Sequence, residues 1–141
     1  LLKRNLLIKV AEIARCLHQN GINHRDFYIC HFLLKAEHDF SNIDPEKLKL
    51  FLIDLHRVQI RKRTPKRWVV KDMGSLYFSA MNIGLTRRDF FRFMKVYQNV
   101  SLRHIFNNDL RFWYQVQQRG IELYQKAFQT LPILVLENKH G

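Results

Sequence analysis

The chain has 141 residues, of which 47% are hydrophobic and 13% aromatic, so it can form a folded core and is not expected to be disordered. Its 24 Lys and Arg against 12 Asp and Glu give a net charge of +12, which indicates an anionic partner such as nucleic acid, a phosphate-bearing lipid or sugar, or a nucleotide. No apolar run approaches the ~20 residues that a membrane-spanning helix needs, so no such segment is expected.

The N-terminal part predicts a helix, a loop and a short strand. Apolar residues recur at three- and four-residue steps over residues 3–20, which is typical of an amphipathic helix, and Gly21 supplies a C-terminal stop. Polar residues 23–26 are typical of a loop, and the apolar and aromatic run 28–34 is typical of a strand.

The next part predicts a surface connection and a second strand. Residues 35–47 are rich in turn-forming side chains, which indicates a connection on the surface. Residues 48–53 form an apolar run that ends at Asp54. If the two predicted strands pair as a hairpin, Asp54 comes close to the polar loop that precedes the first strand.

Residues 55–71 contain most of the local charge asymmetry. They carry seven basic side chains and no acidic one, and we expect a loop with Pro65 in its middle. The basic residues are Arg57, Arg61, Lys62, Arg63, Lys66, Arg67 and Lys71.

The C-terminal half predicts three helices. Helical spacing runs over residues 72–83 and stops at Gly84. Thr86 and Asp89 form a capping-box pattern, which predicts a helix over residues 87–97, and a last helix is expected over residues 109–131. The whole chain is therefore predicted to be α+β and mainly helical, with a small β-hairpin.

Two acidic residues stand in positions that suit phosphate transfer. Asp26 lies in a loop as part of a His24-Arg25-Asp26 triplet, and Asp54 ends a strand. Phosphoryl transfer needs one carboxylate to orient and deprotonate the attacking hydroxyl, and another to hold the metal that bridges the phosphates. Protein kinases place the same residue types in the same order, with a His-Arg-Asp triplet followed by a metal-binding Asp on a later strand.

Four stretches, in this order, resemble the lipopolysaccharide core heptose(I) kinases of Gram-negative bacteria. They are residues 23–34, 53–57, 76–86 and 93–97, and the resemblance covers about residues 3–105. It implies a protein-kinase-like fold, the use of ATP and Mg²⁺, and phosphorylation of the first heptose of the inner core. It also implies a cytoplasmic enzyme that lies at the periphery of the inner membrane.

The resemblance implies roles for individual residues. Asp26, with His24 and Arg25 of the same triplet, corresponds to the catalytic loop, in which Asp26 takes the proton of the sugar hydroxyl. Asp54 corresponds to the metal-binding Asp. Asp72, expected to open the next helix, corresponds to a structural Asp that anchors the catalytic loop by accepting main-chain N–H bonds.

Two residues depart from the general protein-kinase pattern. His31 stands where protein kinases have an Asn that binds a second metal, and imidazole is a poor ligand for Mg²⁺. We therefore expect one metal, with His31 hydrogen-bonded to Asp26, substrate or phosphate. His56 replaces the glycine two residues after the metal-binding Asp, so this segment loses easy access to positive φ.

The resemblance suggests a substrate-binding role for the basic segment, residues 55–71. A nascent lipopolysaccharide (lipid A–core) acceptor carries phosphates and acidic sugars, so the arginines of the segment are candidate substrate or phosphate contacts. An alternative is a solvated face, or one that touches an anionic membrane surface without recognising a substrate. Nucleic acid is not an expected partner. The candidate contacts are Arg57, Arg61, Arg63 and Arg67.

Residues 1–141 are interpreted as the C-terminal lobe of a kinase. No two of the five glycines lie close enough to form a Gly-rich phosphate loop, so we expect the nucleotide-binding lobe to precede Leu1 and this chain alone to be inactive. Alternatives are a kinase for another envelope sugar or for a protein, and a basic nucleic-acid-binding module. The last predicts salt-sensitive binding that is independent of Asp26.

Overall fold

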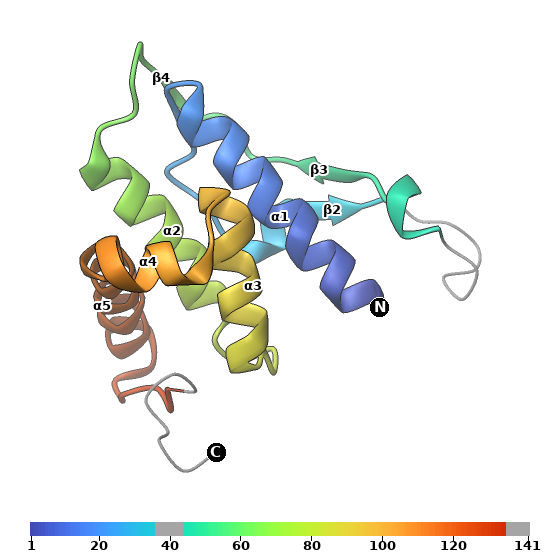
Figure 1. The fold of residues 1–141 in the computed structure, drawn as a ribbon. Helices are drawn as coiled ribbons and strands as arrows, with labels where there is room; N and C mark the ends of the chain where they lie inside the picture. Colours follow the sequence, from blue (N-terminus) through green and yellow to red (C-terminus); the bar gives the residue numbers. More distant parts are fainter. Residues whose placement is uncertain (36–43, 135–141) are drawn as a thin grey trace.

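The computed structural model describes residues 1–35 and 44–134, and these form a mainly helical unit with two small antiparallel sheets (Figure 1). The predicted α+β class is confirmed. In chain order the elements are α1 (Leu2–Gln19), β1 (Ile22–Asn23), the 3-10 turn η1 (Ile29–His31), β2 (Phe32–Leu34), the 3-10 turn η3 (Pro45–Lys47), β3 (Leu50–Leu52), β4 (Gln59–Ile60), α2 (Lys66–Ala80), α3 (Arg87–Gln98), α4 (Leu102–Asn108) and α5 (Leu110–Phe128).

Helix α1 confirms the first predicted element. Its apolar stripe buries Val10, Ala11 and Ala14 in the core. The helix ends before Gly21, whose φ of +77° is a conformation that side-chain-bearing residues rarely adopt. A Cβ at Gly21 would lie 1.8 Å from the main-chain oxygen of Arg61, so only glycine allows this close approach.

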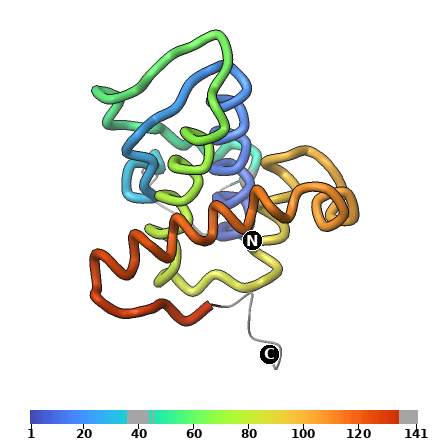
Figure 2. The backbone as a smooth tube through the Cα atoms, turned by 90° about the vertical axis from the view of Figure 1, so that its left-hand side faces the viewer, coloured from blue at the N-terminus to red at the C-terminus, as the bar shows by residue number. Residues whose placement is uncertain are grey.

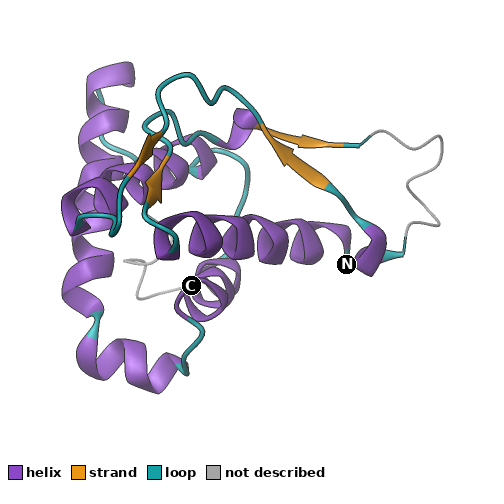
Figure 3. Cartoon of the chain, turned by 90° about the horizontal axis from the view of Figure 1, so that it is seen from above, coloured by secondary structure: helices purple, strands orange, loops and turns teal. Residues whose placement is uncertain are grey.

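The predicted hairpin is confirmed in its pairing but is shorter than expected. β2 pairs with β3 in antiparallel register, with Phe32 opposite Leu52. The predicted strand over 28–34 is wrong for its first half, because residues 29–31 form the turn η1, and the Ile29 N–H bonds to the Ser79 hydroxyl of α2. Viewed from above, this hairpin runs alongside α1, toward the N-terminus of that helix (Figure 3).

The second sheet pairs β1 with β4, with Ile22 opposite Ile60, and it was not predicted. It ties the start of the polar loop to the basic segment. Of the predicted connection over 35–47, residues 36–43 lie outside the described residues, and η3 occupies its end.

Helix α2 begins at Lys66, so the predicted loop over 55–71 with Pro65 in its middle is wrong in its last third. Pro65 is the residue that caps the helix, and proline suits a helix start because its φ is already helical and the first N–H groups have no partner. Asp72 therefore lies in the middle of α2 rather than at its opening. The helix ends at Ala80, before the predicted end at Ile83.

The remaining helices pack on α1, on α2 and on one another. The capping box of Thr86 and Asp89 is present at the start of α3, as predicted. Helix α4 was not predicted, and α5 ends at Phe128, short of the predicted end. α1 packs against α3 and α2 packs along α5, and Figure 2 shows α5 crossing the molecule. Helices α2 and α5 lie so close together that a Cβ on Gly120 would lie 2.4 Å from Cδ1 of Tyr77.

None of the helices among residues 1–35 and 44–134 is long and apolar enough to cross a membrane.

Candidate active site

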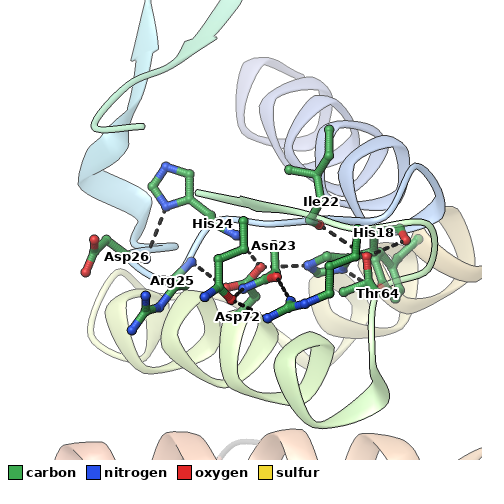
Figure 4. Close-up of polar contacts among 11 residues, drawn as sticks. His18, Ile22, Asn23, His24, Arg25, Asp26, Thr64 and Asp72 are labelled. Atoms are coloured by element: carbon green, nitrogen blue, oxygen red, sulfur yellow. Dashed lines mark hydrogen bonds and ion pairs between the residues drawn. The ribbon is translucent and has the colours of Figure 1, made fainter. Parts of the chain in front are cut away.

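Asp72 holds the main chain of the His-Arg-Asp loop. Its Oδ2 accepts a hydrogen bond of 2.8 Å from the His24 N–H, and its Oδ1 accepts one of 2.9 Å from the Arg25 N–H (Figure 4). The carboxylate is almost fully buried, at 1% exposure. Because buried charges need hydrogen-bond partners, the loop and the carboxylate stabilise each other in one geometry.

A buried chain of hydrogen bonds continues from Asp72 through α1 to α3. His18 Nε2 lies 2.9 Å from Asp72 Oδ2, and His18 Nδ1 lies 2.7 Å from the Tyr97 hydroxyl. The carboxylate accepts only, so Nε2 carries the hydrogen, and when Nδ1 carries none the Tyr97 hydroxyl donates to it. Burial, and secondarily the charge of Asp72, raise the pKa of Tyr97, so its hydroxyl keeps its proton.

His24 joins the loop to the end of strand β3. The side chain is completely buried, and its Nε2–H donates to the Ile53 carbonyl at 3.0 Å. Its Nδ1 accepts from the Asp26 N–H at 3.2 Å. Both ring nitrogens are therefore engaged inside the protein, and the ring fixes Asp26 relative to Ile53, the residue before Asp54.

Asp26 has one paired and one unpaired carboxylate oxygen. Oδ1 accepts a hydrogen bond of 2.8 Å from Arg57, whose side chain is about half exposed. Oδ2 is buried and has no hydrogen-bond partner among the described residues. A buried acceptor without a partner is costly, and such exceptions are often explained by function. The side chain as a whole is 15% exposed, so a hydroxyl can approach the carboxylate only from that exposed part.

His31 bridges the two predicted acids. Its Nδ1 lies 2.6 Å from the main-chain oxygen of Asp26, and its Nε2 lies 3.2 Å from Oδ2 of Asp54. Both partners accept only, so both contacts form as hydrogen bonds together only when both ring nitrogens carry hydrogen. The contact to Asp26 runs through its main chain and leaves the carboxylate available.

Asp54 can serve as one oxygen ligand for a hard cation. Its side chain is about one third exposed, and its second oxygen contacts His56 Nδ1. Hard carboxylate oxygens suit Mg²⁺, which takes few protein ligands and completes its shell with waters and phosphates. The described residues contain no group of three or more His, Cys, Asp and Glu that could form a complete protein cage. The residues present therefore fit Mg²⁺ held by Asp54 together with substrate phosphates.

The backbone around this site uses positive φ at unexpected positions. Asp54 has φ of +62° and Arg25 has φ of +77°, whereas His56 has an ordinary backbone. The loss of a glycine at His56 therefore does not remove left-handed backbone from the segment. Left-handed backbone occurs instead at Asp54 itself and at Arg25, the residue before Asp26.

The four candidate arginines of the basic segment differ in their surroundings. Arg57 contacts Asp26, as described above. Arg61 faces inward and donates hydrogen bonds of 2.8 Å to the side chains of Asn23 and Gln59. Arg63 and Arg67 are exposed. The structure thus brings one of the four directly to the predicted catalytic Asp.

Sequence reasoning missed three residues of this region. His18 and Tyr97 extend the Asp72 network, and Trp68 lies among Arg and Lys side chains. One signal was available for His18, because it follows Ala11 and Ala14 on the buried stripe of α1. A polar side chain on a buried stripe needs a partner.

A separate apolar cavity of about 770 Å³ lies between α1, α2, α3 and α5. It is lined almost entirely by aliphatic and aromatic side chains, among them Leu6, Val10, Leu76, Phe90, Met94 and Trp113. None of the residues that hold Asp26 or Asp54 lines it.

Comparison with known families and curated proteins gives one consistent result. Residues 1–97 match the lipopolysaccharide kinase (Kdo/WaaP) family. The chain is 46% identical over 127 residues to the lipopolysaccharide core heptose(I) kinase WaaP of Escherichia coli, over 90% of this chain and 47% of that protein. It is 56% identical over 103 residues to WaaP of E. coli strain K12, over 73% of this chain and 38% of that protein.

A relative from Pseudomonas aeruginosa and a solved structure agree with this result. The chain is 44% identical over 125 residues to the P. aeruginosa WaaP, over 89% of this chain and 46% of that protein. A solved WaaP structure, in complex with acyl carrier protein, matches with a TM-score of 0.76 and 43% identity, over 87% of this chain and 50% of that one. The chain thus spans half or less of the length of each of these relatives.

Proposed function

The chain belongs to the lipopolysaccharide kinase (Kdo/WaaP) family, and we propose that it supplies the catalytic loop and metal-binding Asp of an ATP-dependent sugar kinase. The acceptor is the first heptose of the lipopolysaccharide inner core, presented on nascent lipid A–core at an anionic membrane surface. The observation that carries the proposal is the position of the His31 ring, which contacts the main chain of Asp26 and the carboxylate of Asp54 and so brings the two acids together.

Asp26 is the catalytic base in this proposal. Its carboxylate, which is 15% exposed, accepts the proton of the attacking sugar hydroxyl, while Arg57 holds Oδ1 and fixes the plane of the carboxylate. General base catalysis of this kind contributes about 10²–10⁴-fold to the rate.

Asp54 is the metal ligand. Mg²⁺ bound with ATP neutralises the charge that develops on the transferring phosphoryl group. His31 contacts the same carboxylate and the main chain of Asp26, and it therefore keeps the metal-binding oxygen at a constant distance from the base. This arrangement supports one metal ion at Asp54.

His24, Arg25 and Asp72 act as positioning residues. His24 is fully buried with both nitrogens occupied, and Asp72 binds the loop through its main chain. His24 and Asp72 are enclosed in the protein and cannot reach a substrate, so they act through the geometry of Asp26.

The chain corresponds to the catalytic lobe, and the grip on ATP comes from a further lobe of the enzyme. Arg57 contacts Asp26, and Arg63 and Arg67 are exposed on the same basic segment, where they support recognition of an anionic acceptor.

The test uses the full-length enzyme with ATP, Mg²⁺ and a heptosylated lipid A acceptor. Asp26→Asn and Asp54→Asn keep side-chain shape and should lower kcat by about 10²-fold or more. Glu12→Gln, at an exposed position of α1, makes the same charge change and should have normal activity. Phosphate transfer at the wild-type rate by Asp26→Asn would disprove the role of Asp26 as the base. Phosphorylation of a protein or another sugar in preference to the heptose would show that the proposed acceptor is wrong.

We further propose that an acyl carrier protein is a partner of this chain, since the solved relative is described in that complex and the chain holds an apolar cavity of about 770 Å³. The cavity would take the acyl chain, because its lining offers aliphatic and aromatic surface. Leu110→Glu, at an exposed lining position, should weaken binding of acylated carrier protein, whereas Leu33→Glu, exposed on β2, should not. Equal binding by both variants would exclude the cavity as the acyl site.

A further inference from the structure

Four cations surround Trp68 in the first turn of α2. The guanidinium carbons of Arg25, Arg61 and Arg67 lie 5.5, 5.7 and 5.7 Å from the ring centroid, and Lys71 Nζ lies 4.6 Å from it. We call this group the Trp68 cluster. It joins the loop of Asp26, the residue after β4 and the first half of α2, which are separate in sequence.

None of the four cations of the Trp68 cluster forms an ion pair in the described part of the chain, residues 1–35 and 44–134. Arg61 bonds only to the neutral side chains of Asn23 and Gln59. All four lie within 5.7 Å of the same ring centroid, so their positive charges repel one another.

The ring at the centre of the cluster adds a further donor. Trp68 Nε1 is buried and has no hydrogen-bond partner among the described residues. An indole N–H only donates, and the Arg and Lys side chains also only donate. Apart from the face of the ring, the cluster therefore contains donors and positive charge but no acceptor, and a phosphate group at the exposed cations Arg67 and Lys71 supplies acceptors.

The Trp68 cluster is connected to the catalytic loop through Arg25. The main-chain N–H of Arg25 is held by Asp72, and its backbone has φ of +77°. Arg25 precedes Asp26, so an anion that holds the Arg25 guanidinium also holds the strained backbone beside the base. Binding of an anionic group to the cluster can thus stabilise the position of Asp26.

We propose that the Trp68 cluster binds a phosphate group of the acceptor glycolipid, at a position separate from the hydroxyl that Asp26 deprotonates. This proposal rests on the proposed kinase function and names a second contact for its substrate. Bidentate arginine contacts and the charge of the lysine provide the affinity, and Arg25 connects phosphate binding at the Trp68 cluster to the geometry of the catalytic loop.

The test measures binding and transfer separately in the full-length enzyme. Two acceptors are compared, the phosphorylated lipid A–core acceptor and the same acceptor after phosphatase treatment. The variant Arg67→Gln/Lys71→Gln removes the two exposed cations of the cluster, and Arg103→Gln/Arg111→Gln removes two exposed cations of α4 and α5 as a control of equal charge. Binding is measured without ATP, and KM is measured with it.

The wild type and the control variant should prefer the phosphorylated acceptor. In the Arg67→Gln/Lys71→Gln variant this preference should be about 100-fold smaller, because two charge-assisted hydrogen bonds are lost and each is worth about tenfold. Its KM for ATP should stay unchanged.

Three results would overturn the proposal. The first is an unchanged preference for the phosphorylated acceptor in the Arg67→Gln/Lys71→Gln variant. The second is an equal loss of binding to both acceptors in that variant, which indicates general attraction to an anionic surface. The third is the absence of any preference in the wild type. A wild type that binds with the expected preference but transfers no phosphate would refute the kinase function and leave the cluster proposal standing.

Discussion

The main-chain N–H of His24 donates a 2.8 Å hydrogen bond to Asp72, which lies in the middle of helix α2. The loop that carries Asp26 thus takes its shape from a helix that begins forty residues further along the chain. The four predictions below follow from this arrangement and from the caps and ion pairs that surround it.

Replacing Asp72 by Asn should disturb the loop without changing the size of the side chain. The amide supplies one acceptor, and its NH₂ group faces an N–H donor where the carboxylate had a second acceptor. We expect kcat to fall on the order of 10- to 100-fold, because small displacements of a catalytic group are costly, while KM for ATP changes little. Steady-state kinetics of the full-length enzyme check this, and an unaltered kcat would contradict the anchoring role.

Replacing Tyr97 by Phe should destabilise the protein through His18. The hydroxyl that donates to His18 Nδ1 is lost, and a buried acceptor is left without a partner. The free energy of unfolding should fall by about 1–3 kcal/mol, measured by urea denaturation. Tyr114→Phe, at an exposed position of α5, is the matched control and should change stability by no more than about 0.5 kcal/mol.

Replacing Arg57 by Gln should affect catalysis more than stability. The ion pair with Asp26 involves a half-exposed arginine, and exposed pairs contribute only about 0–1 kcal/mol to folding. The carboxylate loses the partner of Oδ1, however, so Asp26 is held less firmly and kcat should fall. Arg57→Lys keeps the positive charge but not the planar guanidinium group, and its kcat should lie between the values for the wild type and for Arg57→Gln. Identical kcat values for all three proteins would show that Arg57 does not position the base.

Asp89 should make the stability of α3 depend on pH. The main-chain hydrogen bond from Thr86, and also the hydroxyl of Thr86 and the charge of Lys3, hold the pKa of Asp89 below 3.8. Because the pKa is lower in the folded state, the stabilisation is fully present above the unfolded value and is lost as pH falls through the lowered pKa.

Asp89→Ala tests this contribution. At pH 7 it should lower the free energy of unfolding by about 1 kcal/mol, as the loss of a cap usually does. The difference from wild type should shrink as the pH is lowered below 3.8. A difference of the same size at pH 7 and at acid pH would show that the charge of Asp89 is not responsible.

Local sequence patterns predicted the elements that local physics determines. The apolar spacing of α1 and the capping box of α3 act within a few residues, so both helices were found. The start of α2 was missed because its first turn carries Lys66 and Arg67, and charge suggested a loop where Pro65 begins a helix. Helix α4 is short and capped by Ser101, with little apolar periodicity to reveal it.

The candidate site divides in the same way. Asp26 and Asp54 stand in short motifs that reveal the chemistry of each residue, so both were predicted, and their catalytic roles remain proposals. His18, Tyr97 and Trp68 owe their importance to partners that lie far away in sequence, such as the contact between His18 and Tyr97 across 79 positions. No spacing rule connects such residues before the helices are packed.

Gly21 limits the sequences that this fold can accept. Its main chain lies against the carbonyl of Arg61, and the clash with a side chain would come from backbone rather than from an atom that can rotate away. In a library of random point variants, position 21 should therefore tolerate glycine alone, although it contacts no substrate in the proposed mechanism. Position 61 contributes to the same contact through its main chain, so it should tolerate many residues in a screen for folded protein and fewer in a screen for activity.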